Sequence, residues 1–148
     1  MDLILWRHAE AQPGEPDADR ELTVKGRKQA KRMAAWLKNR LSGRYQILAS
    51  PTARTRQTAM TLTADYDVSE DIGPAATARG IVKAAGWPDG KGTVIVVGHR
   101  PGLNRAAALL ITGREHEWEM KRGGLWWLQL RDEGEPAFLR AVMGPKDA

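Results

Sequence analysis

The sequence contains no cysteine among its 148 residues. This composition excludes a disulfide framework and a thiolate nucleophile, and it fits a reducing compartment. Long apolar runs are absent as well. Near the N-terminus, the apolar run that begins at Leu3 is short, since Arg7 interrupts it. We therefore expect no signal peptide and no membrane contact, and a cytoplasmic location.

Aromatic residues are few, at 6% of the chain. Between Arg20 and Arg56 there are eleven Lys or Arg residues and a single acid, Glu21. Such a cluster could bind nucleic acid, but no aromatic residues interleave with the charges in the manner of a base-stacking platform. We expect the positive charge to attract an anionic substrate rather than nucleic acid.

Hydrophobic residues make up 42% and charged residues 28%, which is ordinary for a globular protein and excludes general disorder. A chain of this length is large enough for one real core. Neither an internal repeat nor a long linker is visible. The prediction is one domain over residues 1–148.

Two unbroken apolar runs are each followed at once by a histidine. The run 3–6 leads into Arg7 and His8, and the β-branched run 93–97 leads into Gly98 and His99. Apolar runs without polar alternation are typical of parallel strands that are buried on both faces. Ligands of open α/β sheets bind at the carboxyl ends of such strands.

Helical spacing of apolar residues and helix-start signals predict the remaining elements. Thr23 is a candidate N-cap, and Ser50 followed by Pro51 resembles an N-cap with proline at the first helical position. The expected helices are 24–41, closed by Gly43, then 51–64, 78–85 and 103–111, with Pro101 near the start of the last. A short strand is expected over 46–49, and a hairpin over 125–131 and 137–143.

Arg54 and Arg56 lie two positions apart on the expected helix 51–64. Residues two apart on a helix point to nearly opposite sides, so only one of them can face the strand ends, and Arg54 is nearer the helix start. Parallel neighbouring strands would bring Arg7, His8 and His99 to one sheet edge beside Arg54. Arginines, histidines and helix N-termini that converge in this way predict an anion pocket suited to a phosphoryl group.

Four stretches in this order resemble the histidine phosphatase superfamily. They are Arg7-His8-Ala9, the segment 22–30, the segment Ser50-Pro51-Thr52-Ala53-Arg54-Thr55-Arg56-Gln57-Thr58 and the segment 98–103. The resemblance implies an α/β three-layer α/β/α sandwich with a mostly parallel central sheet and the C-terminal hairpin at an edge. It implies His8 as the nucleophile that accepts a phosphoryl group, with Arg7, Arg54 and His99 as its phosphate-binding partners.

The sequence departs from the family pattern at two places. Ala9 stands where the family usually has glycine, and we expect this methyl group to be tolerated. Many members carry a general acid between the arginine helix and the second histidine, whereas here only Glu70 and Asp71 are candidates. The segment 58–93 is also too short for the cap of the family's mutases, so the chain most resembles the SixA-like phosphohistidine phosphatases.

The expected activity is hydrolysis of protein phosphohistidine through phospho-His8, without a cofactor or a metal. A small-molecule phosphomonoesterase that uses the same site, or an idle phosphoanion-binding adaptor, remains an alternative. Arg20 is an auxiliary candidate for phosphate binding, and His116 is expected at the surface rather than in a metal site. The oligomeric state is left open.

Overall fold

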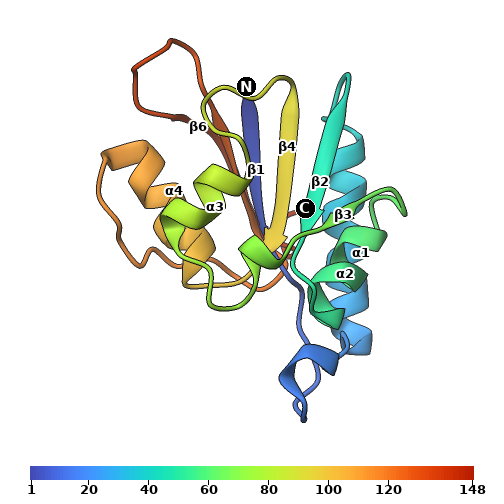
Figure 1. Cartoon of the computed structure of the whole chain (residues 1–148). Helices are drawn as coiled ribbons and strands as arrows, with labels where there is room; N and C mark the ends of the chain where they lie inside the picture. Colours follow the sequence, from blue (N-terminus) through green and yellow to red (C-terminus); the bar gives the residue numbers. More distant parts are fainter.

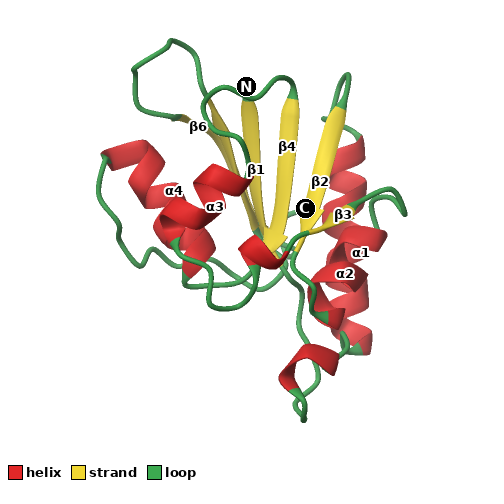
Figure 2. Cartoon of the chain, in the orientation of Figure 1, coloured by secondary structure: helices red, strands yellow, loops and turns green.

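The computed structural model describes residues 1–148 and contains one six-stranded sheet (Figures 1 and 2). The strands are β1 (Asp2–Arg7), β2 (Tyr45–Ala49), β3 (Asp67–Val68), β4 (Thr93–Gly98), β5 (Leu125–Gln129) and β6 (Phe138–Met143). Their order across the sheet is β3-β2-β4-β1-β5-β6. β3, β2, β4 and β1 run parallel, and the β5–β6 hairpin joins the edge of β1 with β5 antiparallel to it.

Helices cover both faces of the sheet. They are α1 (Val24–Lys38), α2 (Ala53–Met60), α3 (Ala78–Ala84) and α4 (Gly102–Thr112), and two short 3-10 turns are η1 (Asp17–Asp19) and η2 (Glu70–Ile72). α1 and α2 pack on one face, and α3 and α4 pack on the other (Figure 1). The expected α/β/α sandwich is therefore confirmed. None of these helices combines the length and the apolar character that a membrane crossing requires.

The central strand β1 is buried on both faces. Leu3 and Leu5 join the core beneath α3 and α4, whereas Ile4 and Trp6 join the core beneath α1 and α2. All four side chains have no exposed surface. Burial on both sides explains the lack of polar alternation in this run, and the first polar side chain able to reach solvent comes where the strand ends.

Parallel pairing of β1 with β4 brings the two histidine segments together. The register runs from Asp2 opposite Thr93 to Arg7 opposite Gly98. Beyond it, the His8 N–H donates to the Gly98 carbonyl at 3.1 Å, and the His8 carbonyl accepts from the Gly123 N–H at 2.9 Å. His8 therefore has its backbone held from both sides at the sheet edge.

The start of α2 differs from the sequence-based prediction. The helix begins at Ala53 with Thr52 as its N-cap and ends at Met60, so Ser50 is not the cap and residues 61–64 are not helical. Ser50 is fully buried, and its carbonyl accepts a hydrogen bond from the Thr55 hydroxyl at 2.7 Å. This side-chain hydrogen bond stabilises the turn that leads into α2, where the sequence predicts capping by the Ser50 side chain.

Other boundaries shift by a few residues. Thr23 is confirmed as the N-cap of α1, where its hydroxyl accepts from the Gly26 N–H at 2.9 Å, but the helix ends at Lys38 rather than near Leu41. Pro101 is the N-cap residue of α4, at the start of the helix as predicted. The two-residue strand β3 was not predicted, because two residues are too few to produce a periodic pattern.

Gly26 allows α1 to approach the chain immediately after His8. A Cβ atom at this position would lie 2.0 Å from the Glu10 carbonyl oxygen, a distance that forces the backbone apart. We expect Gly26→Ala to destabilise the protein by about 1–3 kcal/mol through overpacking, even though alanine favours a helix. Urea unfolding measures the loss. Gly73→Ala is the matched control, since its Cβ would make only an ordinary 3.5 Å contact and its φ of −65° suits alanine; equal stabilities of the two variants would contradict the prediction.

Candidate active site

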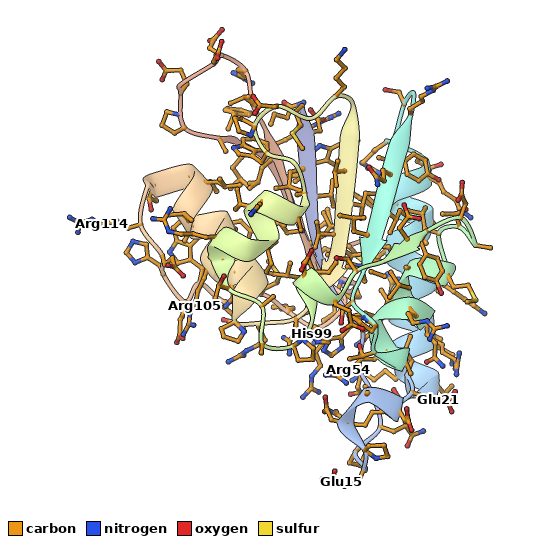
Figure 3. All side chains as sticks on the ribbon, viewed as in Figure 1. Glu15, Glu21, Arg54, His99, Arg105 and Arg114 are labelled. Carbon is orange, nitrogen blue, oxygen red and sulfur yellow. The ribbon has the colours of Figure 1, made fainter.

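A cavity of about 190 Å³ opens at the carboxyl ends of β1 and β4. Its charged or titratable lining consists of two histidines and five arginines, and no carboxylate lines it: His8, His99, Arg7, Arg20, Arg54, Arg100 and Arg122. Figure 3 shows His99, which directly follows β4, and Arg54, on α2, near the strand ends. The structure thus brings together the four residues predicted for phosphoryl chemistry.

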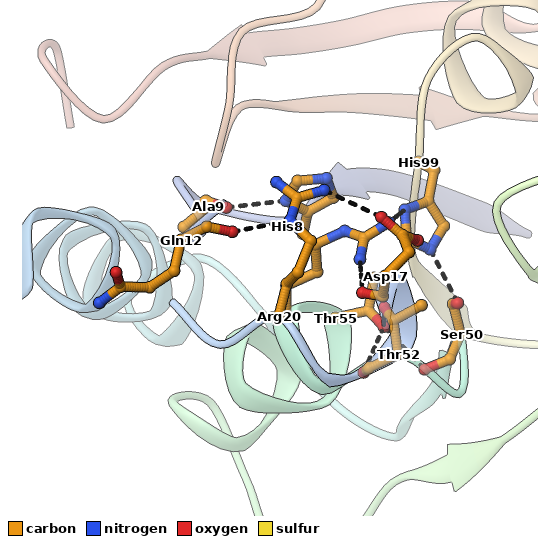
Figure 4. A network of polar contacts seen from close by, with 10 residues as sticks. His8, Ala9, Gln12, Asp17, Arg20, Ser50, Thr52, Thr55 and His99 are labelled. Atoms are coloured by element: carbon orange, nitrogen blue, oxygen red, sulfur yellow. Dashed lines mark hydrogen bonds and ion pairs between the residues drawn. The ribbon is translucent and has the colours of Figure 1, made fainter. Parts of the chain in front are cut away.

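The His8 ring is oriented by its own backbone segment. Its Nδ1 lies 2.7 Å from the Ala9 carbonyl oxygen (Figure 4). A carbonyl can only accept a hydrogen bond, so Nδ1 carries the proton and Nε2 keeps its lone pair. This tautomer presents Nε2 as a nucleophile.

The His8 environment also keeps the imidazole neutral. Burial, opposed by the Ala9 hydrogen bond and assisted by the charges of Arg54, Arg7 and Arg20, lowers the pKa of His8 to about 4. An imidazole is a nucleophile only in its neutral form. At neutral pH His8 is therefore uncharged although cations surround it.

His99 lies against His8 and is 5% exposed. The ring centroids are 5.3 Å apart and the planes are tilted by 57°. His99 Nε2 forms a hydrogen bond with the Ser50 hydroxyl at 2.8 Å (Figure 4). Its Nδ1 lies 3.5 Å from Arg54 Nη2. Burial, followed by the charges of His8 and Arg54, lowers the pKa of His99 to about 3, whereas the Asp17 carboxylate raises it.

An anion in the cavity would act on His99 in the same direction as Asp17. A phosphoryl group carries about two negative charges near neutral pH, and a nearby negative charge favours the imidazolium form. His99 can in this way become a charged hydrogen-bond donor when the phosphoryl group is present. Ser50 fixes which nitrogen faces that group.

Arg54 and Arg56 point in different directions, as the helix phase predicts. Arg54 is 5% exposed and lines the cavity, whereas Arg56 is on the surface. Arg54 Nη1 donates to the Asp17 carbonyl at 2.9 Å, and Nη2 donates to the Asp17 carboxylate at 3.1 Å.

Arg7 and Arg20 also line the cavity, and each is held by a backbone carbonyl. Arg7 is anchored by a 2.7 Å bond from Nη1 to the Met120 carbonyl, and burial, together with two neighbouring arginines, lowers its pKa to about 10. It therefore stays charged at neutral pH. Arg20 Nε donates to the Gln12 carbonyl at 2.7 Å, and its Nη1 donates to the Asp17 carboxylate at 3.0 Å.

Several site residues were missed by the sequence analysis. Arg100 directly follows His99, so its position in the motif was a usable signal. Arg122 and Met120 come from the loop 113–124, which no local pattern connects to the site. The sequence predicts Ser50 as a helix cap, and no local pattern marks Asp17 as a site residue.

Other candidates do not reach the cavity. Glu70 and Asp71 are exposed on η2, and neither lines the cavity, so this segment contributes Pro74 but no acid. His116 is exposed and stacks on Trp118 at 6.0 Å. No group of three His, Asp or Glu side chains is arranged to hold a metal ion.

Ala9 fits its position without backbone strain. No non-glycine residue in the protein has a positive φ, so the position does not need the freedom of glycine. The Ala9 side chain is fully buried, and its N–H donates to the Thr58 hydroxyl at 3.2 Å.

Comparisons with known proteins agree with this geometry. Residues 3–74 match the model of the histidine phosphatase superfamily, branch 1. The structure of the protein histidine phosphatase SixA complexed with tungstate aligns with a TM-score of 0.84 at 26% identity, covering 99% of this chain and 98% of that one. A chain assigned as the phosphohistidine phosphatase SixA of Nakamurella multipartitia aligns with a TM-score of 0.79 at 25% identity, covering 97% and 95%.

The same fold occurs in a phosphoserine phosphatase variant from Entamoeba histolytica, with a TM-score of 0.76 at 16% identity over 99% of this chain and 98% of that chain. The comparison with curated proteins gives no match. The resemblance to the histidine phosphatase superfamily is confirmed over residues 3–74, and the alignments with the SixA structures extend the similarity over nearly the whole chain. Together these findings identify a phosphatase.

The neutral state of both histidines is testable by NMR. Because the pKa values of His8 and His99 are lowered to about 4 and about 3, we expect their ring signals to stay unchanged between pH 8 and pH 5. An unperturbed histidine would be half protonated near pH 6.5. Titration of the ¹⁵N-labelled ring nitrogens provides the measurement. A midpoint near 6.5 for either ring would refute the prediction, and His8→Asn and His99→Asn assign the signals.

The two arginines of α2 form a matched pair for mutation. We expect Arg54→Ala to lower kcat on an aryl phosphate by about 10²-fold, as for loss of one preorganised transition-state donor. Arg56→Ala should change kcat less than about twofold, as is usual for a surface substitution. Steady-state kinetics measure kcat for both variants, and circular dichroism checks that each is folded. Similar losses of kcat in the two variants would mean that Arg54 does not act as a specific transition-state donor.

Proposed function

We propose that the protein hydrolyses phosphohistidine on a partner protein through a covalent phosphoryl intermediate on His8. The observation that carries the proposal is the composition of the cavity wall, in which two neutral histidines and five arginines occur without a carboxylate. Such a wall can bind and transfer a phosphoryl group, but it offers no carboxylic acid to protonate a basic leaving group.

In the first step, the lone pair of His8 Nε2 forms a bond to phosphorus. The bond between phosphorus and the substrate imidazole breaks, and its electron pair returns to the substrate nitrogen. If the other ring nitrogen carries a proton, the leaving group departs as neutral imidazole. Arg7, Arg54 and protonated His99 would stabilise the equatorial oxygens as charge spreads over them.

In the second step, water attacks phosphorus on the phospho-His8 intermediate. The electron pair of the P–N bond returns to Nε2, inorganic phosphate forms, and the proton from water remains on phosphate or passes to solvent. The hydrogen bond from Nδ1 to the Ala9 carbonyl is kept throughout, so the ring returns to its starting tautomer. No metal ion is required at either step, since the arginines supply the positive charge.

The leaving group distinguishes phosphohistidine from ordinary phosphate esters. An alkyl phosphate must expel a strongly basic alkoxide, which normally needs a positioned acid. Imidazole has a pKa close to neutrality and leaves without that help. The absence of Glu70 and Asp71 from the cavity wall therefore supports the phosphohistidine reaction, as does the similarity to SixA at 26% identity.

The test is a comparison of kcat/KM across leaving groups with one preparation of the protein. We expect a phosphohistidine protein to be the best substrate, an aryl phosphate to be intermediate and an alkyl phosphate to be poorest. His8→Asn is the control: it should fold normally and lose turnover of all three. If alkyl phosphates equal or exceed the phosphohistidine protein, the small-molecule phosphomonoesterase reading replaces the proposal, and turnover by folded His8→Asn would remove the covalent mechanism.

A further inference from the structure

Asp17 is the carboxylate that bonds the phosphate-site arginines. One of its oxygens accepts from Arg20 Nη1 at 3.0 Å (Figure 4), and the other accepts from Arg54 Nη2 at 3.1 Å. These two arginines line the cavity, whereas Asp17 does not. Its side chain is 56% exposed, so it can swing away from the arginines into solvent.

The backbone of Asp17 makes a separate contact with Arg54. The Asp17 carbonyl accepts from Nη1 at 2.9 Å, while the carboxylate occupies Nη2, the nitrogen that also faces His99. Arg54 would therefore remain anchored through Nη1 if the carboxylate left. Nη2 and the Arg20 fork are donors suited equally to a carboxylate or a phosphoryl oxygen.

We propose that Asp17 is an intramolecular competitor for the phosphoryl site. Its carboxylate and phosphate bind Arg54 and Arg20 alternately, and this competition sets the affinity of the site for the product phosphate. This inference rests on the proposed phosphoryl site at His8, but it does not depend on which substrate delivers the phosphoryl group.

The chemistry of the cavity makes such a competitor useful. A pocket with several arginines would hold product phosphate tightly and would be inhibited by it. A tethered carboxylate competes at an effective concentration of about millimolar or more. It can re-pair Arg54 Nη2 and Arg20 Nη1 as phosphate leaves, so that these donors are not left without an anionic partner.

A role as general acid does not fit Asp17. Hydrogen bonds from Arg20 and Arg54 lower the pKa of its carboxyl group, so it is ionised at neutral pH and has no proton to donate. The same ionisation is what allows it to compete with an anion. The contact therefore favours the competitor role over proton transfer.

The experiment compares Asp17→Asn with Asp19→Asn, using inorganic phosphate and tungstate as probes. Asp19 lies in the same turn η1, is exposed and makes no ion pair, so its variant controls for the loss of one negative charge near the site. We expect Asp17→Asn to bind both anions about tenfold more tightly by calorimetry and to show a lower inhibition constant for phosphate. Asp19→Asn should change these values less than twofold.

The outcomes separate this inference from the proposed function. Unchanged or weaker anion binding by Asp17→Asn would overturn the competitor role and make Asp17 a residue that positions Arg54. Tightening of equal size in Asp19→Asn would also overturn it, because general charge would then be the cause. Arg54→Ala should weaken phosphate binding strongly; if binding is unchanged, the cavity is not the phosphoryl site and the proposed function fails as well.

Discussion

Parallel pairing of β1 with β4 is the interaction on which the site depends. Both strands are buried on both faces, so their register is fixed by two cores at once. A slip of one residue would exchange the faces and move His8 away from His99. The distance of 5.3 Å between the two rings is therefore a consequence of apolar packing far from the chemistry.

Positive charge has two opposite effects in this cavity. It attracts a phosphoryl group, and it also helps burial to keep both histidines neutral. Neutrality suits the nucleophilic role proposed for His8, because a nucleophile needs its lone pair. The neutral state of His99 can change when a ligand binds, because a phosphoryl dianion in the cavity would offset the neighbouring positive charges and favour protonation of the ring. One electrostatic environment can thus give two identical side chains different roles.

Two loops supply further residues of the cavity wall and the contacts that hold its arginines. The segment 11–21 brings Arg20 and Asp17 to Arg54, and the loop 113–124 brings Arg122 and the carbonyl that anchors Arg7. Most of these contacts join residues far apart in the sequence. They decide how much of the positive charge in the cavity is left unpaired.

The sequence by itself determined the elements that are long or strongly patterned. Apolar runs identified β1 and β4, helical periodicity identified α1 and α4, and the phase of α2 separated Arg54 from Arg56. It also determined the four residues His8, His99, Arg7 and Arg54, because each directly follows or begins an element whose type was readable. These features depend on local spacing, which the sequence contains in full.

Only the tertiary structure decided the partners of those residues. Ser50 looked like a helix cap and instead bonds His99, since the turn into α2 is closed by Thr55. Glu70 and Asp71 were candidates by order along the chain, yet η2 turns them to solvent. Asp17 and Arg122 carried no local signal at all. Hydrogen bonds and ion pairs between distant segments depend on how loops fold back over the sheet, and no periodicity in the sequence encodes that path.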